Sequence, residues 1–374
     1  MDALVLSCGT GGGHDSAGRA ITEELKRRGH NAQMLNPYSL QSQQLAHRIN
    51  RIYTRTVQKM PGFFGGVYGV GEFYRNLPFH SPVYFANHGM VSAMQKYFDG
   101  HPCDMVISSH LFPAEILTNM KHCGLAVPKT MFVATDYTCI PFTEETECDA
   151  YIIPSESLTV AYEQRGIPRE KVYPIGIPVH RSFSKAESRE AARQRLGLER
   201  DKQYILITGG SMGGGKIGET IETFINGIPS ARQTELIIIC GSNRELYEKL
   251  TAAAYPGVTV VGYTDDMAGY LKSADIFVTK PGGLSSTEAA VCGVPILHTA
   301  AIPGCETYNA RYFHESGMSE SCETPEEALQ KALTLLNDEG TCTSMIQRQK
   351  KRIEPFAAEK ICQLAENICS ASIQ

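Results

Sequence analysis

The sequence predicts an α/β protein made of two Rossmann-like, doubly wound domains that face each other across a cleft. Short apolar runs alternate with helical stretches along the chain, which is the pattern of a parallel sheet covered on both faces. The pattern starts twice, and each time a glycine-rich loop directly follows the first strand. At 374 residues the chain is also long enough for two domains of similar size.

The first domain is predicted to span residues 1–178. It opens with a strand over 2–7, a glycine loop, and a helix over 14–28 that ends at Gly29. Its further strands are expected at 32–35, 105–107, 130–134, 151–153 and 172–175. Because these runs are short, apolar and separated by helical stretches, we expect one parallel sheet.

The second domain is predicted to span residues 188–345. Its strands are expected at 204–208, 236–239, 258–261, 276–279 and 296–298. The remainder, 346–374, has no sheet to join, and 344–367 is predicted as one helix that packs back across the domains. In such sheets ligands bind beyond the carboxyl ends of the strands, so we expect the site in the cleft between the domains.

Composition excludes several classes of protein. A net charge of -5 and a pI near 6.1 leave no basic footprint for nucleic acid. The twelve cysteines contain no C-x-x-C pair, so we expect reduced thiols in a cytoplasmic protein, without disulfides or structural zinc. No run approaches 18 apolar residues, which leaves attachment to a membrane surface as the open possibility.

The first glycine loop, "VLSCGTGGGH", ends in a candidate catalytic base. Its glycines, including Gly12 and Gly13, allow a ligand to approach the backbone closely. His14 follows at the start of the helix, and a histidine can take a proton near neutral pH. The alternative is that His14 merely caps the helix.

The second glycine loop, "GGSMGGGKIGE", resembles a P-loop only in part. Gly210, Gly215 and Lys216 match the motif, but Ile217 replaces the hydroxyl residue that binds magnesium. Asp275 precedes its apolar strand, so the acid of a P-loop enzyme is missing as well. We therefore expect a metal-free phosphate cradle built from backbone N–H groups. The residues expected to form it are Gly210, Ser211, Met212 and Gly213.

A third segment, "KPGGLSSTEAAVCGVP", is expected to bind a diphosphate and a ribose. The turn at Gly282 and Gly283 opens a helix terminus to an anion. Three hydroxyls are predicted to cap this helix, those of Ser285, Ser286 and Thr287. Glu288, expected in the first turn, offers paired acceptors for ribose hydroxyls. The alternative is a capping box in which Glu288 only satisfies the backbone.

The next helix start, "AIPGCETYNARYF", carries a candidate pair for a sugar. Glu306 and Asn309 are three residues apart and therefore share one helix face. Such a pair suits sugar hydroxyls, although it is also compatible with an ordinary first helical turn.

Together these motifs resemble the UDP-sugar glycosyltransferases of the GT-B class. Within that class the sequence is similar to the monogalactosyldiacylglycerol synthase and diacylglycerol glucosyltransferase family, and more distantly to the transferase that adds N-acetylglucosamine to the lipid-linked peptidoglycan precursor. The motifs that carry the resemblance run in family order over nearly the whole chain. They are "SCGTGGGH", "SSHLFP", "ATDYT", "YIIPSE", "IGIPV", "GGSMGGG", "VGYTDDM", "KPGGLSSTEA" and "PGCETYNA".

The resemblance implies a donor half and an acceptor half. UDP would bind the second half at residues 210–213 and Tyr263, with Glu288 on the ribose. Glu306 and Asn309 would hold the hexose, but Cys305 stands where the family commonly has glutamine, so the identity of the sugar stays open. The first half would bind a lipid, most simply 1,2-diacylglycerol, and transfer would invert the anomeric carbon without metal or cofactor.

The expected base is His14, with Asp136 either orienting the acceptor or replacing His14. His110 is a weaker candidate in the acceptor pocket. Other functions remain as alternatives: another GT-B enzyme acting on UDP-N-acetylglucosamine, such as an epimerase, or a non-catalytic module that binds nucleotide or membrane. Glucose or galactose, the number of sugars added and the oligomeric state are left open.

A basic and aromatic arm is expected to dock on an anionic membrane. Its basic residues are Arg48, Arg51, Arg55 and Lys59, and its aromatic residues include Phe63, Phe64, Tyr68, Phe73 and Tyr74, followed by "PFHSPVYF". Basic and aromatic side chains together favour anionic bilayers. The alternative is that these aromatics belong to the core, but the family favours a peripheral protein at the inner face of the cell membrane.

Overall fold

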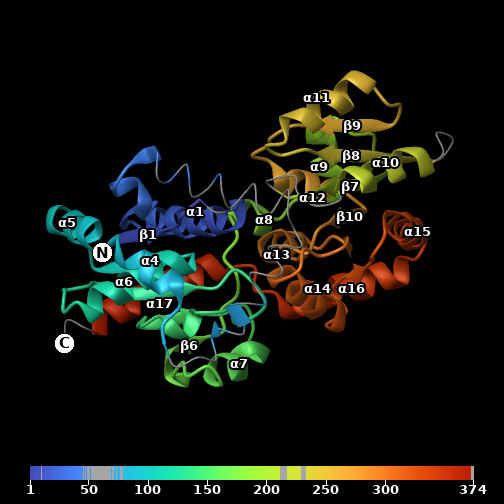
Figure 1. The fold of residues 1–374 in the computed structure, drawn as a ribbon. Helices are drawn as coiled ribbons and strands as arrows, with labels where there is room; N and C mark the ends of the chain where they lie inside the picture. Colours follow the sequence, from blue (N-terminus) through green and yellow to red (C-terminus); the bar gives the residue numbers. More distant parts are fainter. Residues whose placement is uncertain are drawn as a thin grey trace. The chain divides into compact units, whose positions relative to one another are not determined.

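The computed structural model describes residues 1–9, 11–44, 79–210, 217–228 and 233–371, together with isolated positions between 46 and 75. The chain forms two compact units (Figure 1). Unit 1 comprises Met1–His180 and Glu354–Gln374, and unit 2 comprises Arg181–Ile353. The last segment of the chain therefore groups with the first unit.

Unit 1 is built on a six-stranded parallel sheet with the order β2-β1-β3-β4-β5-β6. The strands are β1 (Asp2–Leu6), β2 (Asn31–Leu35), β3 (Met105–Ser108), β4 (Lys129–Val133), β5 (Ala150–Ile152) and β6 (Val172–Tyr173). All six were predicted, with bounds that differ by one or two residues. The strand order changes direction between β1 and β3, which makes this the topological switch point of the sheet.

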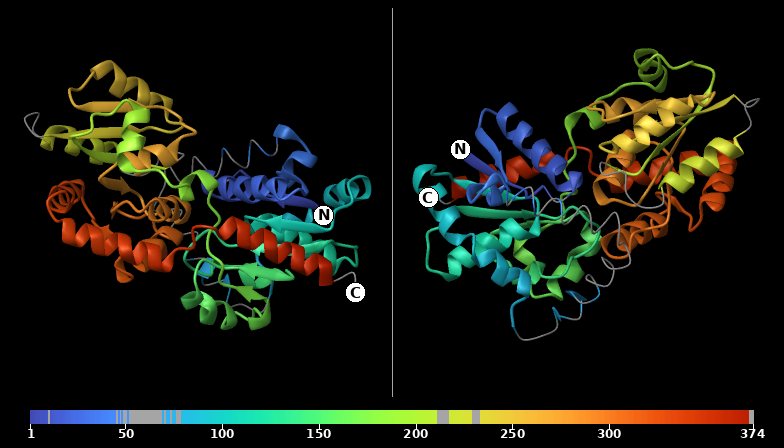
Figure 2. Two further views of the ribbon diagram at one scale, coloured as in Figure 1. Left: turned by 180° about the vertical axis from the view of Figure 1, so that it is seen from behind. Right: turned by 45° about the horizontal axis from the view of Figure 1, so that its top comes forward.

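Helices cover both faces of this sheet. They are α1 (Gly12–Arg27), α4 (Pro82–His88), α5 (Val91–Gly100), α6 (Leu111–His122), α7 (Thr159–Glu163) and α17 (Ala357–Ala371), with short 3-10 turns η1 (Pro37–Leu40), η2 (Thr143–Glu145), η3 (Glu156–Leu158) and η4 (Arg169–Lys171). Val5 and Ile107 pack against Ile21 of α1 and Ile361 of α17 on one face. Alternate residues of the same strands pack against α5 and α6 on the other face. Figure 2 shows α1 and α17 side by side.

Unit 2 contains the second parallel sheet, with the order β12-β11-β10-β7-β8-β9. Its strands are β7 (Gln203–Thr208), β8 (Thr234–Ile239), β9 (Val258–Val261), β10 (Ile276–Thr279), β11 (Ile296–His298) and β12 (Glu320–Ser321). The first five confirm the prediction. β12 was missed because its two residues are polar and form no apolar run. The switch point of this sheet lies between β7 and β10.

The helices of unit 2 also lie on both faces of the sheet, which makes it a second Rossmann-like unit. They are α8 (Arg181–Ser184), α9 (Arg189–Leu196), α10 (Ile217–Gly227), α11 (Arg244–Ala253), α12 (Met267–Ser273), α13 (Gly283–Cys292), α14 (Cys305–Glu315), α15 (Pro325–Leu335) and α16 (Glu339–Arg352). One core joins Ile205 and Val278 of the sheet to Phe224 of α10 and Ala332 of α15.

The prediction of a single helix over 344–367 is wrong. Two helices occupy this region: α16 ends at Arg352, and α17 begins at Ala357. Ile353 is extended, with φ -102° and ψ 126°. Pro355 follows two residues later; it disfavours the helical conformation at Glu354 and supplies no N–H group, so the helix stops here. Within the described part of the chain, no helix is long and apolar enough to cross a bilayer.

Candidate active site

In unit 1 the predicted acceptor-side residues follow three neighbouring strands. Gly12 and His14 lie in the first turn of α1, which follows β1, whereas His110 follows β3 and Asp136 follows β4. β1, β3 and β4 are parallel neighbours, so these loops emerge at one edge of the sheet, beside its switch point.

His14 is held by two residues that the sequence interpretation did not single out. Its Nδ1 atom lies 2.9 Å from the Ser109 carbonyl oxygen and 2.9 Å from the Thr135 hydroxyl. A carbonyl oxygen can only accept, so a hydrogen bond to Ser109 requires the hydrogen on Nδ1, and the Thr135 hydroxyl oxygen is then a second acceptor of it. The neutral ring then has its lone pair on Nε2, which becomes the basic atom.

His14 does not cap the helix, so that alternative is wrong. α1 begins at Gly12, its N-cap is Gly11 with φ 101°, and no side chain caps it. The positive φ explains the glycine, because a side chain at this position would be strained. His14 lies in the first turn, where its ring can reach the loops after β3 and β4.

His110 packs against His14 and caps α6. The two ring centroids are 4.5 Å apart, edge to face, and Nδ1 of His110 accepts a hydrogen bond from the Phe112 N–H at 3.1 Å. Burial, followed by the nearby charge of His14, holds the pKa of His110 well below its usual range. His110 is therefore neutral and acts as a helix cap; its predicted contact with the acceptor stays a prediction.

In unit 2 a lysine that the sequence analysis had not considered lies at the switch point. Lys280 directly follows β10, and its Nζ forms an ion pair with Glu306. The other carboxylate oxygen of Glu306 accepts a hydrogen bond from the Ile302 N–H at 3.0 Å. Both oxygens are thus fixed before any sugar binds.

Gly210 begins the loop after β7 and lies against the same lysine. Its φ is 74°, and a Cβ atom there would lie only 3.1 Å from Cε of Lys280, so both backbone conformation and space favour glycine. The predicted cradle residues Ser211, Met212 and Gly213 lie outside the described residues. Tyr263, which follows β9, is 69% exposed.

The predicted hydroxyl cap of the next helix is wrong. α13 begins at Gly283 with Gly282 as its N-cap and without a side-chain cap, so the hydroxyl residues lie inside the helix. Ser286 Oγ lies 2.9 Å from His298 Nε2, and Thr287 donates to the Gly283 carbonyl at 2.7 Å. Those two hydroxyls therefore face the protein rather than a ligand.

Glu288 and Ser285 occupy the outer face of α13. Because α13 begins at Gly283, Glu288 lies in its second turn and not in the first turn as predicted. Both residues are partly exposed. The capping-box alternative for Glu288 is wrong because α13 starts at Gly283 and has Gly282 as its N-cap.

Two buried polar residues fix the start of α13 from beneath. Asn309 is fully buried, and its amide donates to the Pro281 carbonyl at 3.1 Å. His298 lies between the hydroxyls of Ser286 and Ser319, the latter at 3.1 Å, and burial lowers its pKa to about 3. The interpretation missed His298, whose only signal is its position at the end of a strand.

Asp275 has a structural role, in agreement with the missing P-loop acid. It precedes β10, pairs with Arg193 at 2.7 Å and accepts a hydrogen bond from the Tyr204 N–H at 2.7 Å. It therefore lies at the amino end of the sheet, opposite the loops that follow β7 and β10.

Comparison with known families assigns both units. A family model described as monogalactosyldiacylglycerol (MGDG) synthase matches residues 14–179. A model of the glycosyltransferase family 28 C-terminal domain matches residues 204–362. The chain therefore carries a domain of the monogalactosyldiacylglycerol synthase type followed by a glycosyltransferase family 28 C-terminal domain, and it is a glycosyltransferase.

Individual relatives agree with this assignment. The glycosyltransferase is 27% identical over 298 residues to the processive diacylglycerol beta-glucosyltransferase of Staphylococcus saprophyticus, a match that covers 77% of this chain and 73% of the relative. Among solved structures, MurG of Acinetobacter baumannii has a TM-score of 0.63 at 17% identity, covering 98% and 99% of the two chains. Anabaena HepE in complex with UDP-glucose has a TM-score of 0.58 at 15% identity, covering 99% and 100%. The enzyme therefore has the GT-B fold.

Proposed function

We propose that this enzyme transfers a hexose from UDP-glucose or UDP-galactose to 1,2-diacylglycerol and forms a β-glycosyl diacylglycerol. The observation that supports the acceptor part of this proposal is the hydrogen bond from His14 Nδ1 to the Ser109 carbonyl. It leaves Nε2 as a proton acceptor at the switch point of unit 1. The Staphylococcus saprophyticus relative, a processive diacylglycerol beta-glucosyltransferase, supports the lipid as acceptor, and the HepE complex with UDP-glucose supports the nucleotide sugar as donor.

In the proposed reaction, His14 Nε2 takes the proton of the acceptor hydroxyl. The acceptor oxygen then forms a bond to the anomeric carbon while the bond from that carbon to the β-phosphate oxygen breaks, and UDP leaves with the electron pair. Attack opposite to the leaving group converts an α-linked donor into a β-glycoside. Asp136 would orient the acceptor hydroxyl, or take the proton in place of His14.

The donor contacts are proposed for unit 2. The diphosphate would lie at the start of α13, where backbone N–H groups and the helix dipole favour an anion, and Gly210 would contribute to the same cradle. Lys280 supplies a positive charge beside Gly210. Tyr263 would contact the uracil and Glu288 the ribose.

The hexose is proposed to bind Glu306. Lys280 and the Ile302 N–H fix its carboxylate, so it can accept from sugar hydroxyls without reorganisation. Asn309 would act on the same sugar through the turn at Pro281 that it holds in place.

The enzyme is further proposed to work without a metal ion, because the phosphate contacts come from backbone N–H groups and a lysine.

The enzyme is also proposed to bind peripherally to the anionic inner face of the cell membrane. Most of the basic and aromatic arm lies outside the described residues, but Arg48 and Arg51 are exposed. Phe79 is 54% and Phe85 64% exposed in the aromatic segment that follows, as expected for a lipid-facing surface.

One experiment tests this proposal. The purified enzyme is incubated with anionic vesicles that contain diacylglycerol and with each UDP-hexose in turn, with and without EDTA, and the lipids are analysed by mass spectrometry. We expect a hexosyl diacylglycerol from one donor, formed equally in EDTA. Cleavage of UDP-N-acetylglucosamine without a lipid product would instead indicate an epimerase, and loss of activity in EDTA that magnesium reverses would contradict the metal-free cradle.

A further inference from the structure

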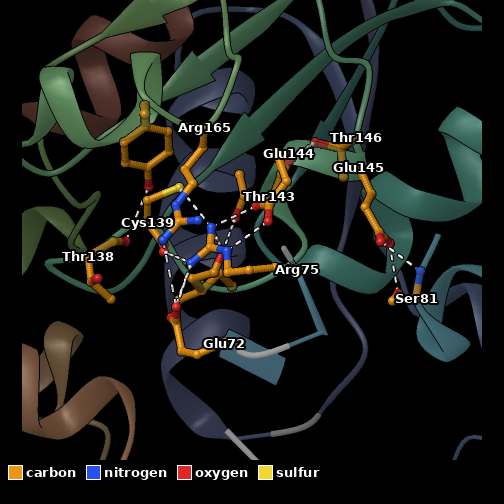
Figure 3. Close-up of polar contacts among 12 residues, drawn as sticks. Glu72, Arg75, Ser81, Thr138, Cys139, Thr143, Glu144, Glu145, Thr146 and Arg165 are labelled. Carbon is orange, nitrogen blue, oxygen red and sulfur yellow. Dashed lines mark hydrogen bonds and ion pairs between the residues drawn. The ribbon is translucent and has the colours of Figure 1, made fainter. Parts of the chain in front are cut away.

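Arg75 forms a buried ionic cluster that none of the proposed steps uses (Figure 3). Its side chain is 2% exposed. Nε and Nη2 each donate to one oxygen of Glu144 at 2.7 Å, which is a bidentate pair. Nη1 donates to Glu72 at 3.1 Å. The Arg75 guanidinium therefore lies between two carboxylates. Glu72 is also 3.8 Å from Arg165.

The same guanidinium holds the loop between β4 and η2. Nη1 donates to the Cys139 carbonyl at 3.2 Å, and Nη2 donates to the Ile140 carbonyl at 3.5 Å. All three nitrogens are therefore used, in a planar arrangement that a lysine ammonium cannot reproduce. The loop that they hold includes Thr135, which contacts His14, and the proposed acceptor-side residue Asp136.

This loop adopts a conformation that requires external support. Phe142 has φ 72°, which lies in the left-handed region of backbone conformation that residues other than glycine rarely adopt. Gly71 lies beneath it, because a Cβ atom there would be 3.4 Å from Pro141. Beyond the loop, Glu145 accepts hydrogen bonds at 2.7 Å from both the N–H and the hydroxyl of Ser81. Two sets of hydrogen bonds therefore hold this segment, those of Arg75 and those between Glu145 and Ser81, as Figure 3 shows.

A cluster of this kind contributes more to geometry than to stability. Removing two charges from water costs about as much as their attraction returns, so an apolar replacement of the whole pair is often neutral. The fixed geometry extends to the base, since Thr135 is in contact with His14 Nδ1 at 2.9 Å.

We infer that Arg75 is a positioning residue for the acceptor side of the site. By holding the Cys139 and Ile140 carbonyls, it keeps Thr135 in contact with His14 and fixes Asp136, the next residue of the loop. This inference rests on the proposed function, because the acceptor reaction is what the loop serves.

The test compares Arg75→Lys with a matched control, Arg193→Lys. Arg193 is 8% exposed and pairs with Asp275, and it donates to the Ser273 and Arg200 carbonyls at 3.0 and 2.9 Å, but it lies in unit 2. We expect Arg75→Lys to lower kcat/KM for diacylglycerol roughly ten- to hundredfold while the KM for the UDP-sugar stays unchanged. Arg193→Lys should leave kcat/KM for diacylglycerol unchanged.

A second variant separates positioning from stability. Arg75→Met combined with Glu144→Met removes the bidentate pair and leaves Glu72 beside Arg165. We expect its melting temperature to stay close to that of the wild type, while kcat/KM for diacylglycerol stays as low as in Arg75→Lys.

Hydrogen exchange gives a readout that does not depend on activity. In the unliganded enzyme, Arg75→Lys should speed amide exchange in residues 135–146 and leave the rest of unit 1 unchanged. Unchanged exchange there, or an equal rise in KM for both substrates, would overturn the inference. If the wild type forms no hexosyl diacylglycerol, the proposed function fails instead, and exchange in 135–146 still decides the role of Arg75.

Discussion

The tautomer of His14 is determined by the atom to which its Nδ1 is hydrogen-bonded. Ser109 presents an uncharged backbone carbonyl, which fixes the ring orientation and the tautomer without a carboxylate partner. Thr135 reinforces the same orientation at 2.9 Å. In the proposed reaction, these contacts leave Nε2 as the atom that takes the proton.

Replacing His14 by alanine should lower kcat roughly a hundredfold or more, because a positioned general base contributes about that much. The affinity for UDP should change little, since the proposed donor contacts lie in unit 2. Transfer assays and calorimetry with UDP measure the two quantities. His101→Ala, an exposed histidine of unit 1, is the control and should behave like the wild type. If Asp136→Asn is far more damaging than His14→Ala, the roles of the two residues are exchanged.

Glu288→Ala should weaken UDP binding by about 1.5 to 3 kcal/mol, because a pair of ribose hydroxyls loses a charged acceptor. This corresponds to roughly a ten- to hundredfold rise in Kd, which calorimetry can measure directly. Glu315→Ala, at the exposed end of α14, is the control for removal of a charge in the same unit. An unchanged Kd would show that Glu288 does not touch the nucleotide.

At the scale of elements, a buried polar network ties α4 and η1 to α6. Tyr38 of η1 donates to Asn87 of α4 at 2.5 Å, and Asn87 donates to Glu115 of α6 at 2.5 Å. Glu115 is fully buried, and its Oε1 has no hydrogen-bond partner among the described residues. Burial raises the pKa of this carboxyl to about 8.

This raised pKa predicts a pH-dependent stability of unit 1. The contribution of Glu115 to the free energy of unfolding is fully present below pH 4.5, where the carboxyl is also protonated in the unfolded chain. This contribution is lost as the pH rises through about 8. Glu115→Gln removes the titration, so its stability relative to the wild type should rise between pH 4.5 and 8. The upper bound is about 5 kcal/mol at 1.36 kcal/mol per pKa unit. Urea unfolding at pH 5, 6.5 and 8, followed by circular dichroism, measures this. A stability difference that does not vary with pH would show that Glu115 titrates normally.

At the scale of the whole molecule, an acidic chain carries a local basic cluster. The net charge is -5, whereas the arm that begins with Arg48 and Arg51 is basic. Exposed charges are screened beyond about 8 Å at physiological ionic strength. Binding to vesicles should therefore require anionic headgroups and weaken as salt is added.

Reversing Arg51 and Arg55 to glutamate should reduce sedimentation with anionic vesicles and lower activity on vesicle-embedded diacylglycerol, while binding of UDP is unchanged. The matched control reverses Arg244 and Lys249 on α11 of unit 2, which are 88% and 65% exposed. Equal sedimentation of the wild type and the Arg51 and Arg55 variant, both folded, would refute docking through the arm.

The loops of the site could be located from the sequence, but the roles of many side chains could not. Gly210 and the turn at Gly282 were identified because glycine-rich turns after apolar strands are local signals. The hydroxyl residues Ser286 and Thr287 were predicted to cap α13. They are buried inside the helix instead, because α13 starts at Gly283. Lys280 was missed because its partner Glu306 lies 26 residues further along the chain, in α14.

The sequence by itself determined every described strand except β12, the two glycine loops and the doubly wound class of each unit. Hydrophobic periodicity and turn chemistry are properties of neighbouring residues, and they can be read without knowing what packs where. Only the tertiary structure decided which atoms meet. The partners of His14 are 95 and 121 residues away, and they come together because β1, β3 and β4 are adjacent in the sheet. The strand order brings distant loops to one edge of the sheet. It therefore determines which atoms contact His14 Nδ1, and it places the loop that Arg75 holds next to that histidine.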